Sequence, residues 1–238
     1  MSTKKISVII PAYNEAEHIG KTIKKFREQG YDNLEIIVVD NSDDKGKTYE
    51  VSRGSADKVL RFPGPIGLSN ARNEGAKVAE GEIFIFSDAD SWLEPGGIKK
   101  IAVIAAGKSI VGSVLGGDEK NTLKGRIFFF FKNWIYRFKI YQGALGGVIF
   151  CSKDVFLKIG GFDGKKEPAE FQDFIKRAKS AAAEYKIITN CYAFTSMRRY
   201  EKNGYSKTIL FWILWKMLYM FKAKNNLTEN YYKRTKDV

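Results

Sequence analysis

The chain has 238 residues, of which 44% are hydrophobic and 28% are charged, which is typical of a globular protein and excludes a disordered or fibrous one. Two cysteines cannot build a disulfide framework, and the single His18 excludes a histidine-rich metal site. The net charge of +13 arises in two segments, residues 120–141 with +6 and residues 198–238 with +7, so a polyanionic partner would meet specific faces of a neutral body.

The first half of the chain alternates between strand and helix signals. Helical periodicity predicts helices at residues 15–29 and 67–79. Apolar β-branched runs predict strands at residues 6–10, 34–39, 58–62 and 82–86. Continuous apolar strands separated by helices are typical of a mostly parallel sheet that is covered on both faces.

Polar clusters follow three of these predicted strands, at residues 11–14, 40–44 and 88–90. Ligands of such sheets bind beyond the carboxyl ends of the strands. We therefore expect the three clusters to converge on one edge of the sheet.

The second half of the chain is less regular. Strands are predicted at residues 109–115, 145–151 and 186–194. Helices are predicted at residues 98–106, 125–141, 170–183 and 205–222. The two halves share one sheet in this interpretation, which predicts one α/β domain with a C-terminal helical appendage.

Several motifs in a fixed order carry a resemblance to a known family. They are residues 8–15, 38–43, 71–75 and 81–90, then Gly146 and Gly147, Phe156 and residues 160–163. Together, over about residues 5–200, they resemble the family 2 glycosyltransferases, whose GT-A fold is a Rossmann-like, mostly parallel central sheet flanked by helices. Residues 195–200, with the apolar helix after them, are similar to the membrane-associated members of that family.

The resemblance implies a domain organisation. Residues 1–200 would form the GT-A domain, with a nucleotide-binding half at about 1–92 and an acceptor half at about 93–200. Residues 201–238 would form a membrane-surface helix and a basic tail.

Asp88 and Asp90 are the candidate metal ligands, because by resemblance they form the DXD element of the family. A nucleotide-sugar donor carries a diphosphate that must leave, and a divalent cation neutralises the charge that develops on it. Mn²⁺ or Mg²⁺ prefers carboxylate, phosphate and water oxygens. Side chains two residues apart on an extended turn point the same way. The alternative is a solvated turn that caps the following helix.

The resemblance also assigns the residues that would bind the nucleotide sugar: Pro11, Ala12, Tyr13, Glu15, Asp40, Arg72, Asp88, Arg198 and Arg199. Tyr13 would lie against the base, Asp40 would hydrogen-bond it, and Arg72 would also reach the nucleotide. At least one of Arg198 and Arg199 would close over the leaving diphosphate, since guanidinium groups bind phosphate in a bidentate fashion.

Each of these assignments has an alternative. Asp40 could simply form a turn, because aspartate bonds to its own backbone. Arg72 could form a surface ion pair. Arg198 and Arg199 could belong to a basic tail that faces the membrane.

The candidate catalytic residues are Glu170 and Asp173, where the chain departs from the family pattern. Members usually carry Glu-Asp at the start of the helix after Gly-Gly-Phe-Asp, and that aspartate is the general base. Aligning Arg177 with the family's usual arginine places Glu170 at the glutamate and Phe171 at the base. Either Glu170 or Asp173 then substitutes as the base, or no strong base is required.

The missing aspartate favours one kind of acceptor. A sugar hydroxyl has a very high pKa and needs a positioned base, whereas a lipid phosphate is already anionic at pH 7. The departure therefore favours a polyprenyl-phosphate acceptor. The alternative is that these acids only stabilise a helix N-terminus.

Two segments, residues 126–141 and 207–224, combine aromatic and basic side chains. In the first, Phe128, Phe131, Ile135 and Phe138 are predicted to form one helical stripe. Aromatic residues beside lysine or arginine suit an anionic membrane interface. The alternative is a core or a dimer contact. Nucleic acid is disfavoured, because residues 128–131 form a solid apolar block instead of single aromatics along a groove.

The sequence thus predicts a metal-dependent, inverting glycosyltransferase that uses a UDP- or GDP-type sugar and a membrane-linked acceptor, either a polyprenyl phosphate or a lipid-linked glycan. A catalytically degenerate, membrane-bound partner protein is the alternative, and a sugar-nucleotide pyrophosphorylase is a weaker one. No signal peptide opens the chain, and the apolar run at residues 209–221 is shorter than a bilayer requires. The expected location is the cytoplasm, peripheral on the cytoplasmic face of the membrane.

Overall fold

The computed structural model of the chain describes residues 4–138, 142–167, 169–205 and 207–208. The chain divides into two compact units, Met1–Thr195 and Ser196–Val238. The second unit contains α8, Arg198–Asn203. Most of the helix predicted at residues 205–222, together with the basic tail, lies outside the described residues, so the predicted division at residue 200 stays a prediction.

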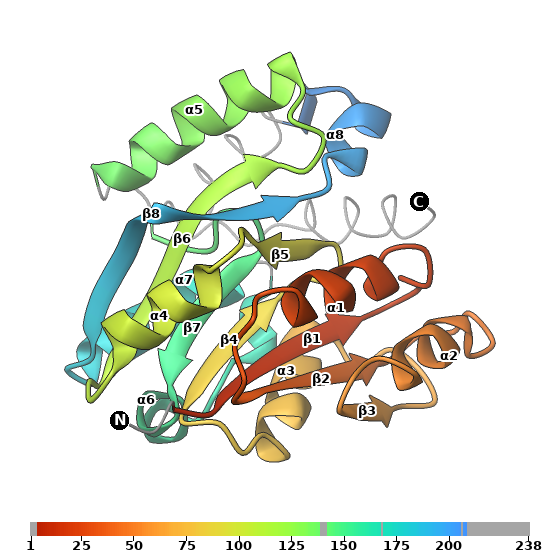
Figure 1. Cartoon of the computed structure of the whole chain (residues 1–238), viewed down its shortest axis with the longest axis horizontal. Helices are drawn as coiled ribbons and strands as arrows, with labels where there is room; N and C mark the ends of the chain where they lie inside the picture. Colours follow the sequence, from red (N-terminus) through yellow and green to blue (C-terminus); the bar gives the residue numbers. More distant parts are fainter. Residues whose placement is uncertain (1–3, 139–141, 168, 206, 209–238) are drawn as a thin grey trace. The chain divides into compact units, whose positions relative to one another are not determined.

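The first unit is built on an 8-stranded sheet with the order β3-β2-β1-β4-β7-β6-β8-β5 (Figure 1). Its strands are β1 Ile6–Ala12, β2 Leu34–Asp40, β3 Lys58–Arg61, β4 Ile83–Ser87, β5 Ser91–Leu93, β6 Ile110–Asp118, β7 Val148–Ser152 and β8 Glu184–Thr195. Only β5 and β7 run antiparallel to their neighbours among these strands. The predicted α/β class with a mostly parallel sheet is confirmed.

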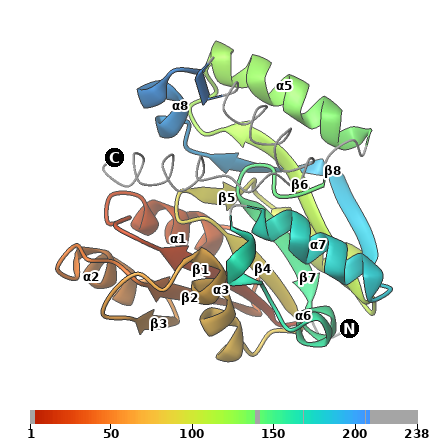
Figure 2. The ribbon, with the colours of Figure 1, turned by 180° about the vertical axis from the view of Figure 1, so that it is seen from behind.

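Helices cover both faces of the sheet (Figures 1 and 2). They are α1 Ile19–Arg27, α2 Lys47–Arg53, α3 Leu68–Lys77, α4 Gly97–Ala105, α5 Leu123–Arg137, α6 Lys153–Ile159 and α7 Glu170–Ser180, with a short 3₁₀ helix at Gly164–Lys166. Because strand side chains alternate, Val8 packs in one core cluster with Phe26 of α1, while Ile9 packs in the other with Phe174 of α7. This burial on both faces explains the continuous apolar runs of β1 and β2.

The structure differs from the sequence prediction at several element boundaries. Helix α1 begins at Ile19 and not at residue 15, because Asn14 has a φ of 57° and the next residues form a turn. The sequence predicted that the strand would end at the glycines at 116 and 117, but β6 continues through both to Asp118. Helix α2 and strand β5 were not predicted, since both are short.

A buried carboxylate holds the sheet together at the amino-terminal ends of its first strands. Glu35 of β2 accepts hydrogen bonds from Ser7 Oγ of β1 and from the backbone N–H groups of Glu80 and Gly81, which precede β4. Its Oε2 lies 3.3 Å from Lys58 Nζ of β3. Burial acts to raise the pKa of Glu35, but these donors hold that pKa below its ordinary value.

Replacing Glu35 with glutamine is therefore expected to lower the free energy of unfolding by about 1–3 kcal/mol at neutral pH. Since the folded-state pKa is lowered, the stabilisation is present above the ordinary pKa of 4.5 and is lost as the pH falls through the folded value. Urea unfolding of both proteins across this pH range measures the effect. A difference between them that does not shrink toward acid pH would contradict the role of the ionised carboxylate.

Candidate functional site

The candidate site lies at the edge of the sheet where β1, β2 and β4 end. Asp88 directly follows β4, and its N–H donates to the Gly147 carbonyl oxygen just before β7, at 3.0 Å. The Asp88 carbonyl in turn accepts from the N–H of Ser91, at 3.1 Å. The turn that carries Asp88 and Asp90 is therefore fixed by hydrogen bonds to its own chain and to the strand beside it.

Ser91 also fixes this turn through its side chain. Its Oγ lies 3.3 Å from Asp90 Oδ1 and 2.9 Å from Thr195 Oγ1 at the end of β8. On the other side, Thr22 Oγ1 of α1 donates to the Ala89 carbonyl at 2.7 Å. Asp88 and Asp90 are both partly exposed, so their carboxylates are accessible at the rim.

A buried arginine joins the rim to helix α7. Arg72 of α3 is 1% exposed; its Nη2 lies 3.0 Å from Asp88 Oδ1 and its Nη1 lies 3.3 Å from Glu170 Oε1. Glu170 is itself buried. Burial raises the pKa of the Glu170 carboxyl, although Arg72 acts in the opposite direction. Arg72 is thus the shared counter-ion of two carboxylates that come from different elements.

Two aromatic rings enclose this guanidinium. The Arg72 Cζ atom lies 4.3 Å from the centroid of the Phe171 ring and 5.4 Å from that of Phe162. Such cation–π contacts are stronger where water is excluded. Phe171, which the sequence resemblance places at the family's usual base position, therefore covers Arg72 in this chain.

The residues at the rim fit a divalent cation. Gly147 has a φ of +73°, and a Cβ there would stand 2.6 Å from Asp88 Oδ2, so the glycine keeps the space beside that oxygen open. Carboxylate oxygens are the donors that Mg²⁺ and Mn²⁺ prefer. No cluster of three or more His, Cys, Asp or Glu ligands occurs among the described residues. Asp88 and Asp90 would therefore share the ion with substrate oxygens and water.

The first two predicted polar clusters are brought together beside this rim. Tyr13 Oη donates to Asp43 Oδ2 at 2.9 Å, and Asn14 Nδ2 donates to Asp43 Oδ1 at 2.7 Å. The Asn14 N–H also donates to Ser42 Oγ at 2.8 Å. Burial raises the pKa of Tyr13, and the hydrogen bond to Asp43 raises it further by a smaller amount.

Asp40 lies at the end of β2 and is fully buried. Its Oδ1 accepts from the Ser42 N–H at 3.1 Å, while its Oδ2, 3.9 Å from Arg61 Nε, accepts no hydrogen bond within the described structure. The Asn41 side-chain oxygen beside it is buried and also has no partner there. Buried acceptors of this kind usually have a hydrogen-bond partner, so both oxygens keep unused acceptor capacity in this structure.

The remaining predicted residues are placed as follows. Pro11 and Ala12 are buried at the end of β1, and the Glu15 N–H donates to Thr48 Oγ1 at 3.0 Å. Asp173 is one helical turn beyond Glu170, and its Oδ2 lies 2.7 Å from Arg177 Nε. Arg198 and Arg199 begin α8 in the second unit, and their action on a leaving diphosphate stays a prediction.

Sequence reasoning missed the close fit of Gly147 against Asp88 and the pairing of Arg72 with Glu170. A glycine pair directly before a strand was the available signal for the first. Nothing local indicated the second, because the partners lie 98 positions apart in the sequence.

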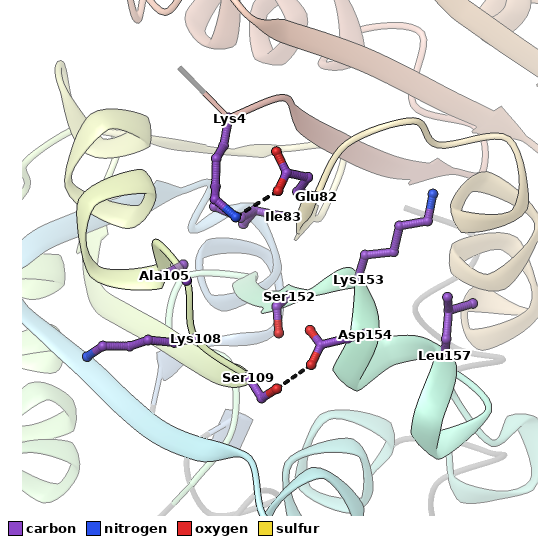
Figure 3. Close-up of a pocket in the computed structure, with 11 residues that line it drawn as sticks. Lys4, Glu82, Ile83, Ala105, Lys108, Ser109, Ser152, Lys153, Asp154 and Leu157 are labelled. Carbon is purple, nitrogen blue, oxygen red and sulfur yellow. Dashed lines mark hydrogen bonds and ion pairs between the residues drawn. The ribbon is translucent and has the colours of Figure 1, made fainter. Parts of the chain in front are cut away.

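A separate hollow of about 480 Å³ lies at the opposite edge of the sheet, where β4 begins and β7 ends (Figure 3). Among its lining residues, Lys4 pairs with Glu82 and the Ser109 hydroxyl donates to Asp154. No predicted site residue lines it.

Comparison with known proteins identifies the family of the chain. The family model described as glycosyl transferase family 2 matches residues 7–160. The dolichol-phosphate mannosyltransferase of Pyrococcus furiosus is 37% identical over 147 residues, which are 59% of this chain and 39% of that protein.

Solved structures share the fold. Mannosyltransferase PcManGT from Pyrobaculum calidifontis, in complex with GDP-Man and Mn²⁺, superposes with a TM-score of 0.65 at 19% identity, covering 81% of this chain and 57% of that one. S. aureus TarS 1-349 in complex with UDP-GlcNAc gives a TM-score of 0.61 at 22% identity, covering 80% and 58%. These matches confirm the predicted GT-A fold. The chain spans less than two thirds of the length of each of these relatives.

Proposed function

The chain belongs to glycosyl transferase family 2, and on that premise we propose that it is a metal-dependent, inverting glycosyltransferase. The donor is a nucleoside-diphosphate sugar of UDP or GDP type, and the acceptor is a membrane-linked polyprenyl phosphate or lipid-linked glycan. The single observation that carries the proposal is the pair Asp88 and Asp90 at the rim, with one carboxylate held by the buried Arg72. Relatives of the same fold bind GDP-Man with Mn²⁺ and UDP-GlcNAc.

Asp88 and Asp90 would hold Mn²⁺ or Mg²⁺, which when bound neutralises charge on the departing diphosphate. Arg72 orients Asp88 by occupying its Oδ1, which leaves Oδ2 facing the space beside Gly147. Asp40 Oδ2 and the Asn41 side-chain oxygen would accept hydrogen bonds from the base. In-line attack at the anomeric carbon then forms the bond to the acceptor oxygen as the bond to the diphosphate breaks, with inversion.

The burial and ion pairing of the two candidate bases support the proposed acceptor class. Glu170 is buried against Arg72, and Asp173 is paired with Arg177. Neither carboxylate is a solvent-facing base, and Phe171 occupies the usual position of one. A polyprenyl phosphate, which is anionic and needs no strong base, fits this arrangement better than a sugar hydroxyl does.

Replacing Asp173 with alanine is therefore expected to change turnover by less than about tenfold, because a general base contributes about 10²–10⁴-fold where one is needed. Glu170→Gln, which keeps the shape of the side chain, is the companion variant. Steady-state turnover with a polyprenyl-phosphate acceptor measures both. A loss of more than about a thousandfold in a folded variant would indicate an essential base and a hydroxyl acceptor.

A thermal-shift panel of UDP-, GDP- and CDP-sugars, with and without Mn²⁺, tests the function itself. One donor is expected to raise the melting temperature, and Mn²⁺ is expected to increase that shift. The absence of any stabilising donor would contradict the proposal. Metal-dependent donor binding with no turnover on any lipid acceptor would instead select the catalytically degenerate alternative.

We place the protein at the cytoplasmic face of a membrane. Within the described part of the chain, no helix has the length and hydropathy needed to cross a bilayer. Cys151 and Cys191 are both buried free thiols, which suits a reducing compartment.

A further inference from the structure

Helix α5 carries a continuous apolar face that is exposed to solvent. Six of the nine large hydrophobic residues that are exposed among the described ones fall between residues 123 and 138, and the other three are scattered singly. The six, here called the α5 stripe, are Leu123, Ile127, Phe130, Phe131, Trp134 and Phe138, with exposed fractions between 50% and 72%. At 3.6 residues per turn they fall within an arc of about 100°.

The stripe differs from the one that the sequence predicted. Phe128 and Ile135, which were assigned to the predicted stripe, are only partly exposed in the structure. Phe130 and Trp134, which were not assigned to it, belong to the exposed stripe and are 67% and 50% exposed.

The opposite face of α5 is fixed to strand β6. Asn133 exchanges two hydrogen bonds with the backbone of Gly116, both at 2.9 Å. Phe129 packs so closely on Gly116 that a Cβ at that glycine would stand 2.4 Å from its ring. The helix is capped by Thr122, whose Oγ1 accepts from the Gly125 N–H. The helix therefore presents the stripe outward from a rigid support.

Basic residues border the stripe on both sides. On the helical wheel Arg126 and Arg137 lie along one edge of it and Lys124 along the other, and all three are exposed. Residues 120–138 contain no acidic side chain. A second copy of the chain that met this face would oppose cation to cation, which is unfavourable. An anionic lipid surface instead accepts aromatic rings at its boundary and basic groups at its headgroups.

We propose that the α5 stripe inserts into the headgroup boundary of an anionic lipid bilayer and holds the first unit on the membrane surface. The proposal deepens the proposed function and rests on it, because it names the surface from which a lipid-linked acceptor would come. The partner is the bilayer itself, recognised through anionic headgroups and the outer part of the acyl chains.

The start of α5 is connected to the candidate site. Strand β6 ends at Asp118, which is paired in register with Thr195 of β8. Thr195 Oγ1 contacts Ser91 Oγ, and Ser91 contacts Asp90. Glu119, the next residue after Asp118, pairs with Lys21 of α1 at 2.6 Å. A bilayer held by α5 would therefore lie at a fixed position relative to the rim.

The first test compares two double variants of the full chain on vesicles of phosphatidylcholine with and without phosphatidylglycerol. Phe130→Ser with Trp134→Ser alters the stripe, and Val103→Ser with Leu157→Ser alters two isolated residues that are 70% and 64% exposed. The stripe variant is expected to bind anionic vesicles at least about tenfold more weakly than the control. Equal vesicle binding of the two variants would overturn the proposal. It would also be overturned if the stripe variant lost self-association, measured by light scattering, but kept its vesicle binding.

A second measurement isolates α5 from the rest of the chain. A fluorophore sensitive to polarity is attached at Phe131→Cys or, as control, at Leu157→Cys. The native Cys151 and Cys191 are fully buried, and burial raises the pKa of both thiols, so the label is expected to react with the introduced cysteine. The label at position 131 is expected to shift to the blue on anionic vesicles and to be quenched by nitroxide lipids, while the label at 157 is unchanged. An unchanged label at 131 on vesicles that bind the chain would overturn the proposal.

Donor binding in solution separates this proposal from the proposed function. The stripe variant without vesicles is expected to keep the metal-dependent thermal shift with the donor. If neither the unmodified chain nor the stripe variant bound a donor, but the stripe variant still bound vesicles more weakly, the membrane role of the α5 stripe would stand and the proposed transferase function would be refuted.

Discussion

Asp90→Asn is expected to lower metal-stimulated sugar transfer by at least about a thousandfold. The substitution keeps the size of the side chain but removes a charge from the pair that would hold the cation. Stabilisation of transition-state charge by a bound metal amounts to several kcal/mol, and each 1.36 kcal/mol is a factor of ten in rate. Transfer rates measured as a function of Mn²⁺ concentration report the loss. The donor-induced thermal shift is also expected to lose its dependence on Mn²⁺.

Asp32→Asn is the matched control, because Asp32 is an exposed aspartate at the start of the turn before β2. It is expected to behave as the unmodified protein in both measurements. If the Asp90 variant kept full metal-stimulated turnover, the cation would have to be held elsewhere, and the mechanism proposed for the rim would be wrong.

Arg72→Met is expected to destabilise the fold by about 3–5 kcal/mol, because it leaves the buried Glu170 carboxylate without its counter-ion. The methionine retains much of the volume between Phe162 and Phe171, so the lost charge and not a cavity dominates the effect. Urea unfolding at neutral pH measures it. Adding Glu170→Gln to Arg72→Met is expected to recover part of the loss, since the double variant buries no unpaired charge there.

Arg53→Met provides the comparison. Arg53 also pairs with a carboxylate, Glu50 at 2.8 Å, but its side chain is 61% exposed, and exposed pairs contribute about 0–1 kcal/mol. Equal losses for Arg53→Met and Arg72→Met would contradict the view that Arg72 is the shared counter-ion of the rim and of α7.

The sequence was sufficient to predict the strand-helix alternation, because buried parallel strands are apolar on both faces. It did not predict that β5 and β7 run antiparallel, since strand direction depends on connections and not on local hydropathy. It also predicted an end to β6 at Gly116, where the glycines instead admit the Phe129 and Phe194 rings.

At the candidate site, the three polar clusters were predicted from their position after strands. The first two are joined by bonds between Tyr13, Asn14 and Asp43, and the third is fixed between Arg72 and Gly147. The burial of Arg72 could not be predicted, because an arginine in the middle of an amphipathic helix is usually solvated. Its burial depends on carboxylates that the tertiary fold supplies from β4 and α7.

The pairing of β5 with the end of β8 has a consequence for biosynthesis. Ser91 and Thr195 are separated by 104 positions, whereas β1, β2 and β4 can assemble from the first part of the chain to leave the ribosome. During translation the part of the rim formed by β1, β2 and β4 can thus assemble early, whereas the contact between Ser91 in the acidic turn and Thr195 forms only after the last strand has emerged. A nascent chain halted before β8 could fold around its first strands, but its acidic turn would lack the contact with Thr195.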